Sequence, residues 1–341
     1  MPNNILSGPF GAYTLSDAKV ISQALAAQGF GTTGNIYYLD PKTGVAGANG
    51  LAPQAIPGQQ GTGPVATLAA GYALMASGNT DVLVLIGDGT TNATARLSAG
   101  FTWSKNAAHF IGICSGSRVS QRARIAPTLA VAGFANFFTL SGNGCYFANL
   151  EFFQGFTTGV AAEICMTVSG QRNTFNNVSI SGMGDTSASA GAADTGSRNL
   201  LLSAGENYFL NCSIGLDTVV RSVANYSVEI TGNSARNMFE GCIFASDCSS
   251  ANAAAILTAA AAAIDRYTMF RGCIFINAIQ SGATSVTGVI KMAASAGGMM
   301  VLQDTWSVGY ASMGFDATSL AQIYSATPVS TRLGGLATVT T

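Results

Sequence analysis

The sequence predicts an all-β protein folded as a parallel β-helix, a solenoid of stacked coils, with short N-terminal helices. Three observations carry this prediction: one short motif recurs along the chain, small residues abound while charges are scarce, and helical periodicity is confined to segments near the N-terminus. A hairpin sandwich also contains many short strands, but it does not return the same side chain to the same slot at a long fixed period. Stacked coils do so, because equivalent residues of successive coils lie above one another.

The recurring motif is Phe, any residue, Asn or Gly, a small apolar residue, any residue, and then Ile or Phe. Its five copies are separated by 28, 34, 30 and 31 residues and begin at Phe147, Phe175, Phe209, Phe239 and Phe270. A degraded sixth copy begins at Leu302. The apolar slots predict stacked core positions. The Asn or Gly slot predicts a corner of the coil, because both residues tolerate left-handed backbone conformations and Asn amides can hydrogen-bond in ladders.

The cysteines follow the same register. There are seven, an odd number, with no Cys-x-x-Cys pair, and His109 is the one histidine. Neither a disulfide framework nor a zinc site is favoured, and we expect no metal and no cofactor. Cys212, Cys242 and Cys273 share one motif slot. We expect them to form a buried ladder of free thiols, although the spacing of stacked strands also permits a disulfide.

The charge and hydropathy of the chain limit the classes of partner that it can bind. Charged residues make up 9% of the chain and the net charge is −1, so there is no electrostatic case for nucleic acid or an anionic membrane as a partner. No apolar run approaches the roughly 20 residues that span a bilayer, and no secretory signal is recognisable at the N-terminus. Because a surface poor in charge promotes association, we expect other chains to cover much of it, most simply in a homotrimer.

Residues 1–64 are expected to form an arm, a short helix and a long loop that contact other subunits. Residues 1–13 carry no periodicity, and residues 16–27 have apolar positions at helical spacing behind an N-cap serine. Residues 36–39 could form a strand. The Gly/Pro/Gln-rich connection from 40 to 64 is too long for a compact domain unless it is functional or lies over another subunit.

Residues 65–310 are expected to form the β-helix itself. A helix at 66–76 precedes the first buried strand and would cap the open apolar end of the solenoid. The low-complexity segment 182–197 lengthens one period and predicts a surface loop. Residues 311–341 lose the period and are expected to form a C-terminal cap or tail. Function is expected where the register breaks.

Several segments also resemble known families. Residues 61–68 together with 81–89 resemble the entry of pectin-lyase-like right-handed β-helices. Residues 95–105 and 118–125 resemble segments of tailed-phage virion proteins of this fold, which are often encoded close to the major capsid protein. The resemblance covers roughly residues 60–310. It implies a right-handed solenoid, a virion location after synthesis in the bacterial cytoplasm, and the major capsid protein or other virion proteins as partners.

The same fold family includes polysaccharide lyases, hydrolases and tailspike enzymes, so an activity must be weighed. At a polygalacturonase-type site the resemblance implies closely set Asp residues, a Gly-His-Gly and an Arg-x-Lys. This chain has no Asp-Asp pair and no Arg-x-Lys, and its His109 stands in Ala-Ala-His-Phe. Glu240 and Arg271 share one repeat slot. Asp217 and Asp247 lie about one period apart and are a candidate carboxylate pair, with turn residues as the alternative interpretation. No catalytic residue is predicted.

The only basic cluster is Arg118, Arg122 and Arg124. Arg122 and Arg124 occupy alternate positions and would share a strand face, where guanidinium groups suit a carboxylate-bearing neighbour. These three residues are therefore the candidate partner contacts, with a solvated edge as the alternative.

The sequence thus favours a non-enzymatic virion structural protein, a trimeric capsid decoration or cement protein that stabilises the shell through its arm and loops. The alternative is a tailspike-like β-helix that binds or depolymerises host surface polysaccharide. A host surface adhesin is a weaker third hypothesis, because no signal peptide is recognisable.

Overall fold

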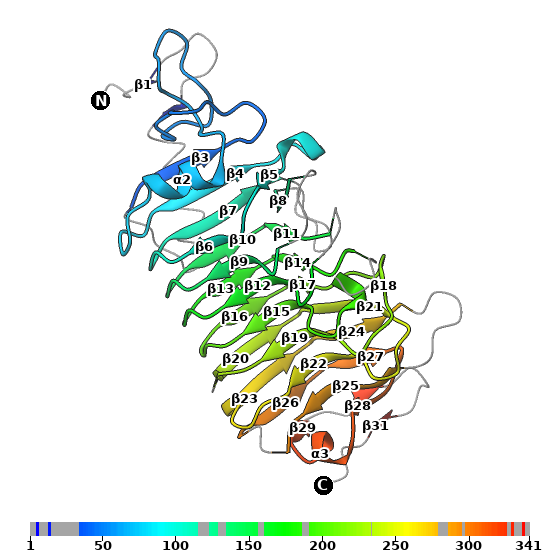
Figure 1. The fold of residues 1–341 in the computed structure, drawn as a ribbon. Coiled ribbons are helices and arrows are strands. Elements are labelled where there is room, and N and C mark those ends of the chain that lie inside the picture. The colour runs from blue at the N-terminus through cyan, green and yellow to red at the C-terminus, as the bar shows by residue number, and fades with distance from the viewer. Residues whose placement is uncertain are drawn as a thin grey trace.

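The protein is a right-handed parallel β-solenoid, seen in a computed structural model as three long sheets that run side by side (Figure 1). The structure describes residues 5–6, 13–14, 34–114, 123–128, 134–155, 160–185, 191–232, 234–278, 286–294, 297–325, 329–330 and 336–337. Each coil contributes one strand to each of three sheets, named B, C and D in the order in which the chain visits them. The predicted fold class is confirmed.

Sheet B begins each coil and carries the motif phenylalanines. Its ten parallel strands are β3 (Ile36–Leu39), β4 (Val82–Ile86), β7 (His109–Ile113), β10 (Tyr146–Ala148), β13 (Thr174–Asn176), β16 (Tyr208–Leu210), β20 (Ser234–Glu240), β23 (Ile264–Arg271), β26 (Met299–Gln303) and β29 (Ile323–Ser325). Strands β3 and β29 lie beyond the predicted solenoid boundaries of 65 and 310. Both lack the motif phenylalanine, but each places an apolar residue in the core, Leu39 from β3 and Ile323 from β29. Each is a terminal strand that stacks on one neighbour only.

Sheet C follows after a tight corner, and sheet D closes the coil. Sheet C contains β5 (Ala95–Leu97), β8 (Arg124–Pro127), β11 (Glu151–Phe153), β14 (Ser179–Ser181), β17 (Ser213–Ile214), β21 (Ile243–Cys248), β24 (Ile274–Asn277) and β27 (Trp306–Val308), with β18 (Val220–Arg221) paired to β21. Sheet D contains β6 (Phe101–Trp103), β9 (Asn136–Leu140), β12 (Ile164–Val168), β15 (Arg198–Leu202), β19 (Tyr226–Ile230), β22 (Ala254–Thr258), β25 (Val286–Met292) and β28 (Tyr310–Gly314).

Other elements lie outside these sheets. They are two antiparallel pairs, β1 (Ile5–Leu6) with β2 (Tyr13–Thr14) and β30 (Val329–Ser330) with β31 (Leu336–Ala337), the 3₁₀ turns η1 (Thr91–Ala93) and η2 (Gly191–Ala193), and helices α2 (Leu68–Leu74) and α3 (Ala317–Leu320). No helix among the described residues is long and apolar enough to cross a membrane. The helix predicted at 16–27 lies outside the described residues.

The corner between sheets B and C explains the Asn or Gly of the motif. Asn149, Asn177 and Asn211 have φ between 53° and 55°, and the glycines that replace them in later coils have φ of 60° and 57°. The Asn177 amide donates to Asn149 Oδ1 of the preceding coil at 2.9 Å. Left-handed backbone is thus required at this slot, and one amide–amide hydrogen bond of the predicted kind is present, between Asn177 and Asn149.

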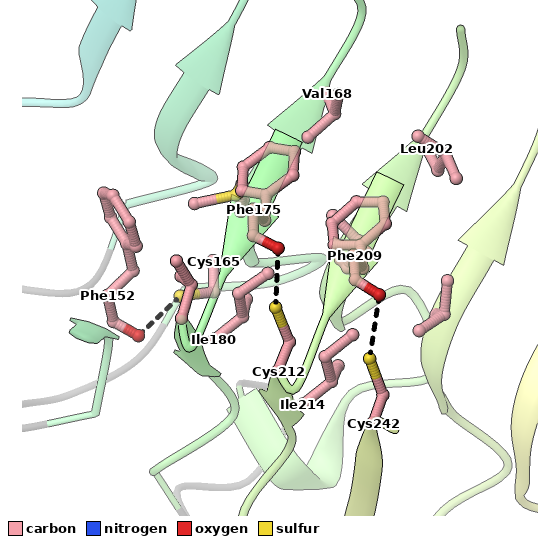
Figure 2. Close-up of a cluster of buried hydrophobic side chains, with 14 of the residues drawn as sticks. Phe152, Cys165, Val168, Phe175, Ile180, Leu202, Phe209, Cys212, Ile214 and Cys242 are labelled. Carbon is pink, nitrogen blue, oxygen red and sulfur yellow. Dashed lines mark hydrogen bonds between the residues drawn. The ribbon is translucent and has the colours of Figure 1, made fainter. Parts of the chain in front are cut away.

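The interior is a continuous stack of the motif side chains. The rings of Phe175, Phe209, Phe239 and Phe270 lie nearly parallel, with centroids 4.5, 4.6 and 4.9 Å apart. The thiols form the predicted ladder: Cys212 and Cys242 each donate from Sγ to the carbonyl of the motif Phe one coil before, as Figure 2 shows. All seven cysteines are free thiols. Burial raises the pKa of the Cys242 thiol well above its ordinary value, so this ladder is inert core.

Both ends of the stack are covered by short helices. Thr67 caps α2 by accepting from the Ala70 N–H at 3.2 Å, and Tyr72 of this helix packs its ring against Trp103 at 4.6 Å. At the other end Asp316 caps α3, and Ser319 Oγ accepts from the Met292 N–H at 2.9 Å. The predicted N-terminal capping helix is therefore confirmed, with bounds shorter by a few residues.

The connection from 40 to 64 folds back on its own coil. The Tyr38 N–H donates to the Gly50 carbonyl at 2.7 Å, the Val45 N–H donates to the Pro64 carbonyl at 3.0 Å, and Val65 bridges to Leu39. The Asp40 carboxylate holds the first turn by accepting from the Lys42 N–H. Local hydrogen bonds therefore satisfy several backbone groups of this loop, and its contact with other subunits stays a prediction.

Candidate functional site

The predicted basic cluster is only partly described. Arg118 and Arg122 lie outside the described residues. Arg124 begins β8, where it is 8% exposed, and its Nε donates to Glu151 of the next coil at 2.6 Å. Its guanidinium also lies over the Phe153 ring at 5.3 Å. Arg124 thus pairs within the chain, and its contact with a partner protein stays a prediction.

The outer face of sheet D carries a recess of about 400 Å³. It is bounded by strands β19, β22 and β25 of three successive coils and by turns that precede or follow strands of sheet D. Its lining residues are Thr195, Ala224, Tyr226, Leu257, Thr258, Ala259, Lys291, Met292 and Ala293. Strand register places Glu229, Leu257 and Lys291 on consecutive rungs. Pockets of this size bind small ligands in many proteins.

Tyr226 forms the floor of the recess, where it is 7% exposed. Lys291 Nζ donates to the Tyr226 hydroxyl at 3.3 Å and lies 4.7 Å from the centroid of the Phe315 ring. The Arg198 guanidinium lies over the Tyr226 ring at 4.8 Å. Two cations thus surround one phenol ring, an arrangement stabilised by the electrostatic attraction of a cation to a π face.

Arg198 fixes one wall of the recess. Its Nε donates to Glu229 Oε2 at 2.8 Å, and its Nη1 donates to the carbonyls of Thr195 and Ser197 at 2.7 Å each. Burial lowers the pKa of the Arg198 guanidinium, and the Glu229 carboxylate opposes that effect. Arg198 therefore ties the end of the 182–197 insertion to sheet D.

Lys291 is differently placed. No carboxylate among the described residues lies within ion-pairing distance of it. Its ammonium group, the Tyr226 hydroxyl and two threonine hydroxyls are the polar groups of the lining, and aromatic and aliphatic carbons supply the rest. Such a lining suits a ring that carries both hydroxyl groups and C–H faces, because the donors orient it while the apolar carbons exclude water.

A buried carboxyl group lies just before β12, the strand of sheet D one coil before the strand that carries Arg198. Glu163 is 1% exposed, so its carboxyl group is almost fully removed from water. Burial raises the pKa of Glu163 to about 7, the Asp185 carboxylate acts in the same direction, and the nearby Val160 and Met183 N–H groups oppose both. Its backbone carbonyl accepts from the Arg198 N–H at 2.9 Å, so this carboxyl adjoins the strand that carries Arg198.

The other titratable candidates do not assemble into a site. Asp247 is buried and pairs in register with Val220, whereas Asp217 is exposed, so these two carboxylates do not share a face. His109 is 2% exposed and its Nδ1 accepts from the Tyr146 N–H; burial lowers the pKa of His109 to about 4. No group of three or more His, Cys, Asp or Glu side chains that could hold a metal occurs within the described part of the chain.

Sequence reasoning missed the recess because it followed the inward positions, which repeat. Tyr226 and Lys291 face outward, and outward positions carry no recurring motif. One signal was available: Thr195 lies in the 182–197 insertion, the segment that breaks the period. The structure places the end of that insertion against sheet D.

Comparison with known proteins identifies the fold. Neither a protein-family model nor a curated protein matches the sequence. Among solved structures, a pectate lyase matches at 16% identity with a TM-score of 0.53, over 89% of this chain and 69% of its own. A pectin methylesterase in complex with a hexasaccharide matches at 15% and 0.50, over 84% and 82%. The pectin methylesterase of Erwinia chrysanthemi matches at 14% and 0.50, over 86% and 90%.

These neighbours overturn the prediction of a non-enzymatic capsid decoration protein, because the solved chains that share the fold over most of their length are carbohydrate-active enzymes. The prediction failed because the missing Asp, His and Arg-x-Lys motifs exclude one type of active site and not activity on this fold in general. At these identities the likeness shows the fold alone.

Proposed function

We propose that the protein binds polysaccharide in the recess on sheet D and acts on it there, as a tailspike-like β-helix directed at host surface glycan. The observation that carries the proposal is the recess itself, in which Tyr226 and Lys291 form a hydrogen-bonded pair at the base of a cavity of about 400 Å³. Neighbouring folds named as pectate lyase and pectin methylesterase support it. A virion location stays a prediction under this proposal, and the homotrimer predicted from the sequence is the alternative to the two-fold contact proposed below.

The lining divides into a binding part and a proton-transfer part. The Tyr226 ring and the aliphatic atoms of Leu257 and Met292 offer apolar contact to the C–H face of a sugar ring. The Lys291 ammonium offers donors to its oxygens. The Tyr226 hydroxyl is the group placed for proton transfer, because it lies in the recess and accepts a hydrogen bond from the Lys291 ammonium at 3.3 Å.

Two conservative variants test this division. Purified protein is incubated with pectin, capsular polysaccharide and lipopolysaccharide, and new reducing ends, released methanol and unsaturated products are measured together with retention in glycan-containing gels. We expect the wild type to be retained by at least one glycan and to release product from it. Tyr226→Phe keeps the ring and should retain binding while losing turnover.

Lys291→Gln should weaken binding itself, because it removes the one lining cation that has no carboxylate partner among the described residues. Arg172→Gln is the matched control, since Arg172 is an exposed cation that pairs with Glu206 away from the recess. If no glycan is retained, or if Tyr226→Phe and Lys291→Gln behave like Arg172→Gln, the recess is not the site.

A further inference from the structure

A second surface, on sheet B, is apolar and accessible. Register stacks one outward residue from each of five successive strands of this sheet, and these residues, which we name the apolar ladder, are Tyr208, Met238, Met269, Val301 and Tyr324. With strands about 4.8 Å apart, the ladder runs for about 19 Å along the solenoid. Tyr267 and Met299 flank it at 37% and 40% exposure, and Tyr324 is 54% exposed.

The solvent exposure of the outer face of sheet B changes along the solenoid. In the first coils its outward residues Tyr38, Val84, Ile111 and Tyr146 are at most 7% exposed and belong to one small cluster. Tyr146 is in register with the apolar ladder, and the other three lie in the outward row beside it. From β16 onward the equivalent positions are accessible to solvent. Outward positions of a solvated sheet are usually polar, so a contiguous apolar row of this kind marks a surface that another molecule covers.

A polar row runs beside the apolar ladder. It contains Glu240 of β20, Arg271 of β23 and Gln303 of β26 on consecutive rungs. Glu240 accepts from the Tyr208 hydroxyl at 2.6 Å, and Arg271 Nε donates to Gln303 at 3.1 Å. The Arg271 Nη1 to Glu240 distance is 3.6 Å, which is longer than a direct hydrogen bond. The side chains are 43% and 31% exposed, so both charges retain capacity for a further partner.

We propose that this face binds a second copy of the chain about a two-fold axis that lies between the two sheets, parallel to the strands and midway between β20 and β23. Such an axis reverses the order of the rungs. Glu240 then faces Arg271 of the partner subunit, Arg271 faces Glu240 of the partner subunit, and Met238 faces Met269 of the partner subunit. A two-fold contact requires this self-complementarity: when one residue of the first copy contacts a second residue of the other copy, symmetry produces the reciprocal contact as well.

The charges argue for a second copy over a different protein. The chain has a net charge of −1, so it offers no long-range attraction to a strongly charged partner. The axis exchanges the two rungs that carry Glu240 with Met238 and Arg271 with Met269. Each charge therefore meets the opposite charge of the other copy, and each methionine meets a methionine. Methionine side chains adapt to one another at contact surfaces, which suits their position next to the axis. The recess on sheet D lies on another face and stays open in this arrangement.

Charge reversal tests the pairing without relying on contacts inside one chain. Glu240→Arg places two arginines opposite each other in a homodimer, and Arg271→Glu places two glutamates opposite each other. Each variant alone is expected to dissociate at least about tenfold more readily than the wild type, since like charges opposed at an interface are repulsive. An equimolar mixture pairs Arg with Glu at both places and should restore the dimer, as a heterodimer, although each chain still carries its own like-charged pair.

Mass is measured by analytical ultracentrifugation on the full chain, with circular dichroism to confirm that each variant is folded. The expected wild-type mass is twice 34.6 kDa. Arg172→Glu, a charge reversal at an exposed residue outside both rows, should not change it. A monomeric wild type, a trimeric mass, unimpaired single variants, or a mixture that fails to recover the dimer each overturns the proposal.

Discussion

Replacing Arg198 by methionine probes the connection between the fold and the recess. The Arg198 side chain is 8% exposed, and it makes one charged hydrogen bond to Glu229 and two to the carbonyls of Thr195 and Ser197. Methionine keeps much of the apolar stem and removes all three. Breaking a buried ion pair by deleting one partner costs about 3–5 kcal/mol. Glu229 keeps some contact with water at 21% exposure, so we expect about 3 kcal/mol, at the lower end of this range.

The assay is the free energy of unfolding from denaturant titration, with Arg172→Met as the matched control. Arg172 also pairs with a glutamate, at 2.7 Å, but its side chain is 68% exposed, so its loss should cost less than about 1 kcal/mol. Arg198→Met should also weaken glycan retention, because the loop carbonyls that border the recess lose their donor. A cost below about 1 kcal/mol for Arg198→Met, or equal costs for the two variants, would refute this account of how the wall of the recess is held.

Three further predictions concern the solenoid. The pKa of Glu163 is about 7 in the folded state, above its ordinary value of 4.5, so the folded state binds the extra proton. The free energy of unfolding should therefore fall by up to about 3 kcal/mol as pH rises from 4.5 to 7. Glu163→Gln should abolish this slope in denaturant titrations across the same pH window. Asn207→Ala removes the amide oxygen that accepts from the buried Asn173 N–H at 3.0 Å, and it should lower the free energy of unfolding by about 2 kcal/mol. A change near zero would show that water replaces the lost amide oxygen. Phe239→Ala opens a cavity between two stacked rings and should lower the free energy of unfolding by about 3–5 kcal/mol. The control Tyr267→Ala, at a residue that is 37% exposed, should lower it by less than about 1 kcal/mol. Similar losses for the two variants would contradict the assigned core register.

The inward half of the structure could be predicted because stacking forces repetition. Each coil places Phe239 and its equivalents at one core position, and the corner demands Asn or Gly, so the sequence records both constraints every coil. The period then yields the fold, the thiol ladder and the capping helix. The hydrogen bonds that tie the connection from 40 to 64 to Tyr38 and Val65 could not be predicted, because they are made by backbone groups, which leave no side-chain signature.

The outward half could not be predicted in the same way. Arg198, Tyr226 and Lys291 come from three coils and meet only because the strand register brings them together. Nothing in their local sequence distinguishes them from other surface residues. The Asp217 and Asp247 pair failed for a related reason, since the short strand β18 shifts the register so that Val220, and not Asp217, lies beside Asp247.

The central claim, that glycan binds in the recess on sheet D, is tested most directly by methyl NMR of the methionines. Met292 lines the recess, whereas Met269 lies in the apolar ladder of sheet B. Both signals are assigned from Met292→Leu and Met269→Leu variants, and the protein is then titrated with fragments of the glycan that it retains in gels. The account predicts that the Met292 signal moves in a saturable way while the Met269 signal stays in place. A shift of Met269 alone, or a titration in which Met292 does not move, would contradict it.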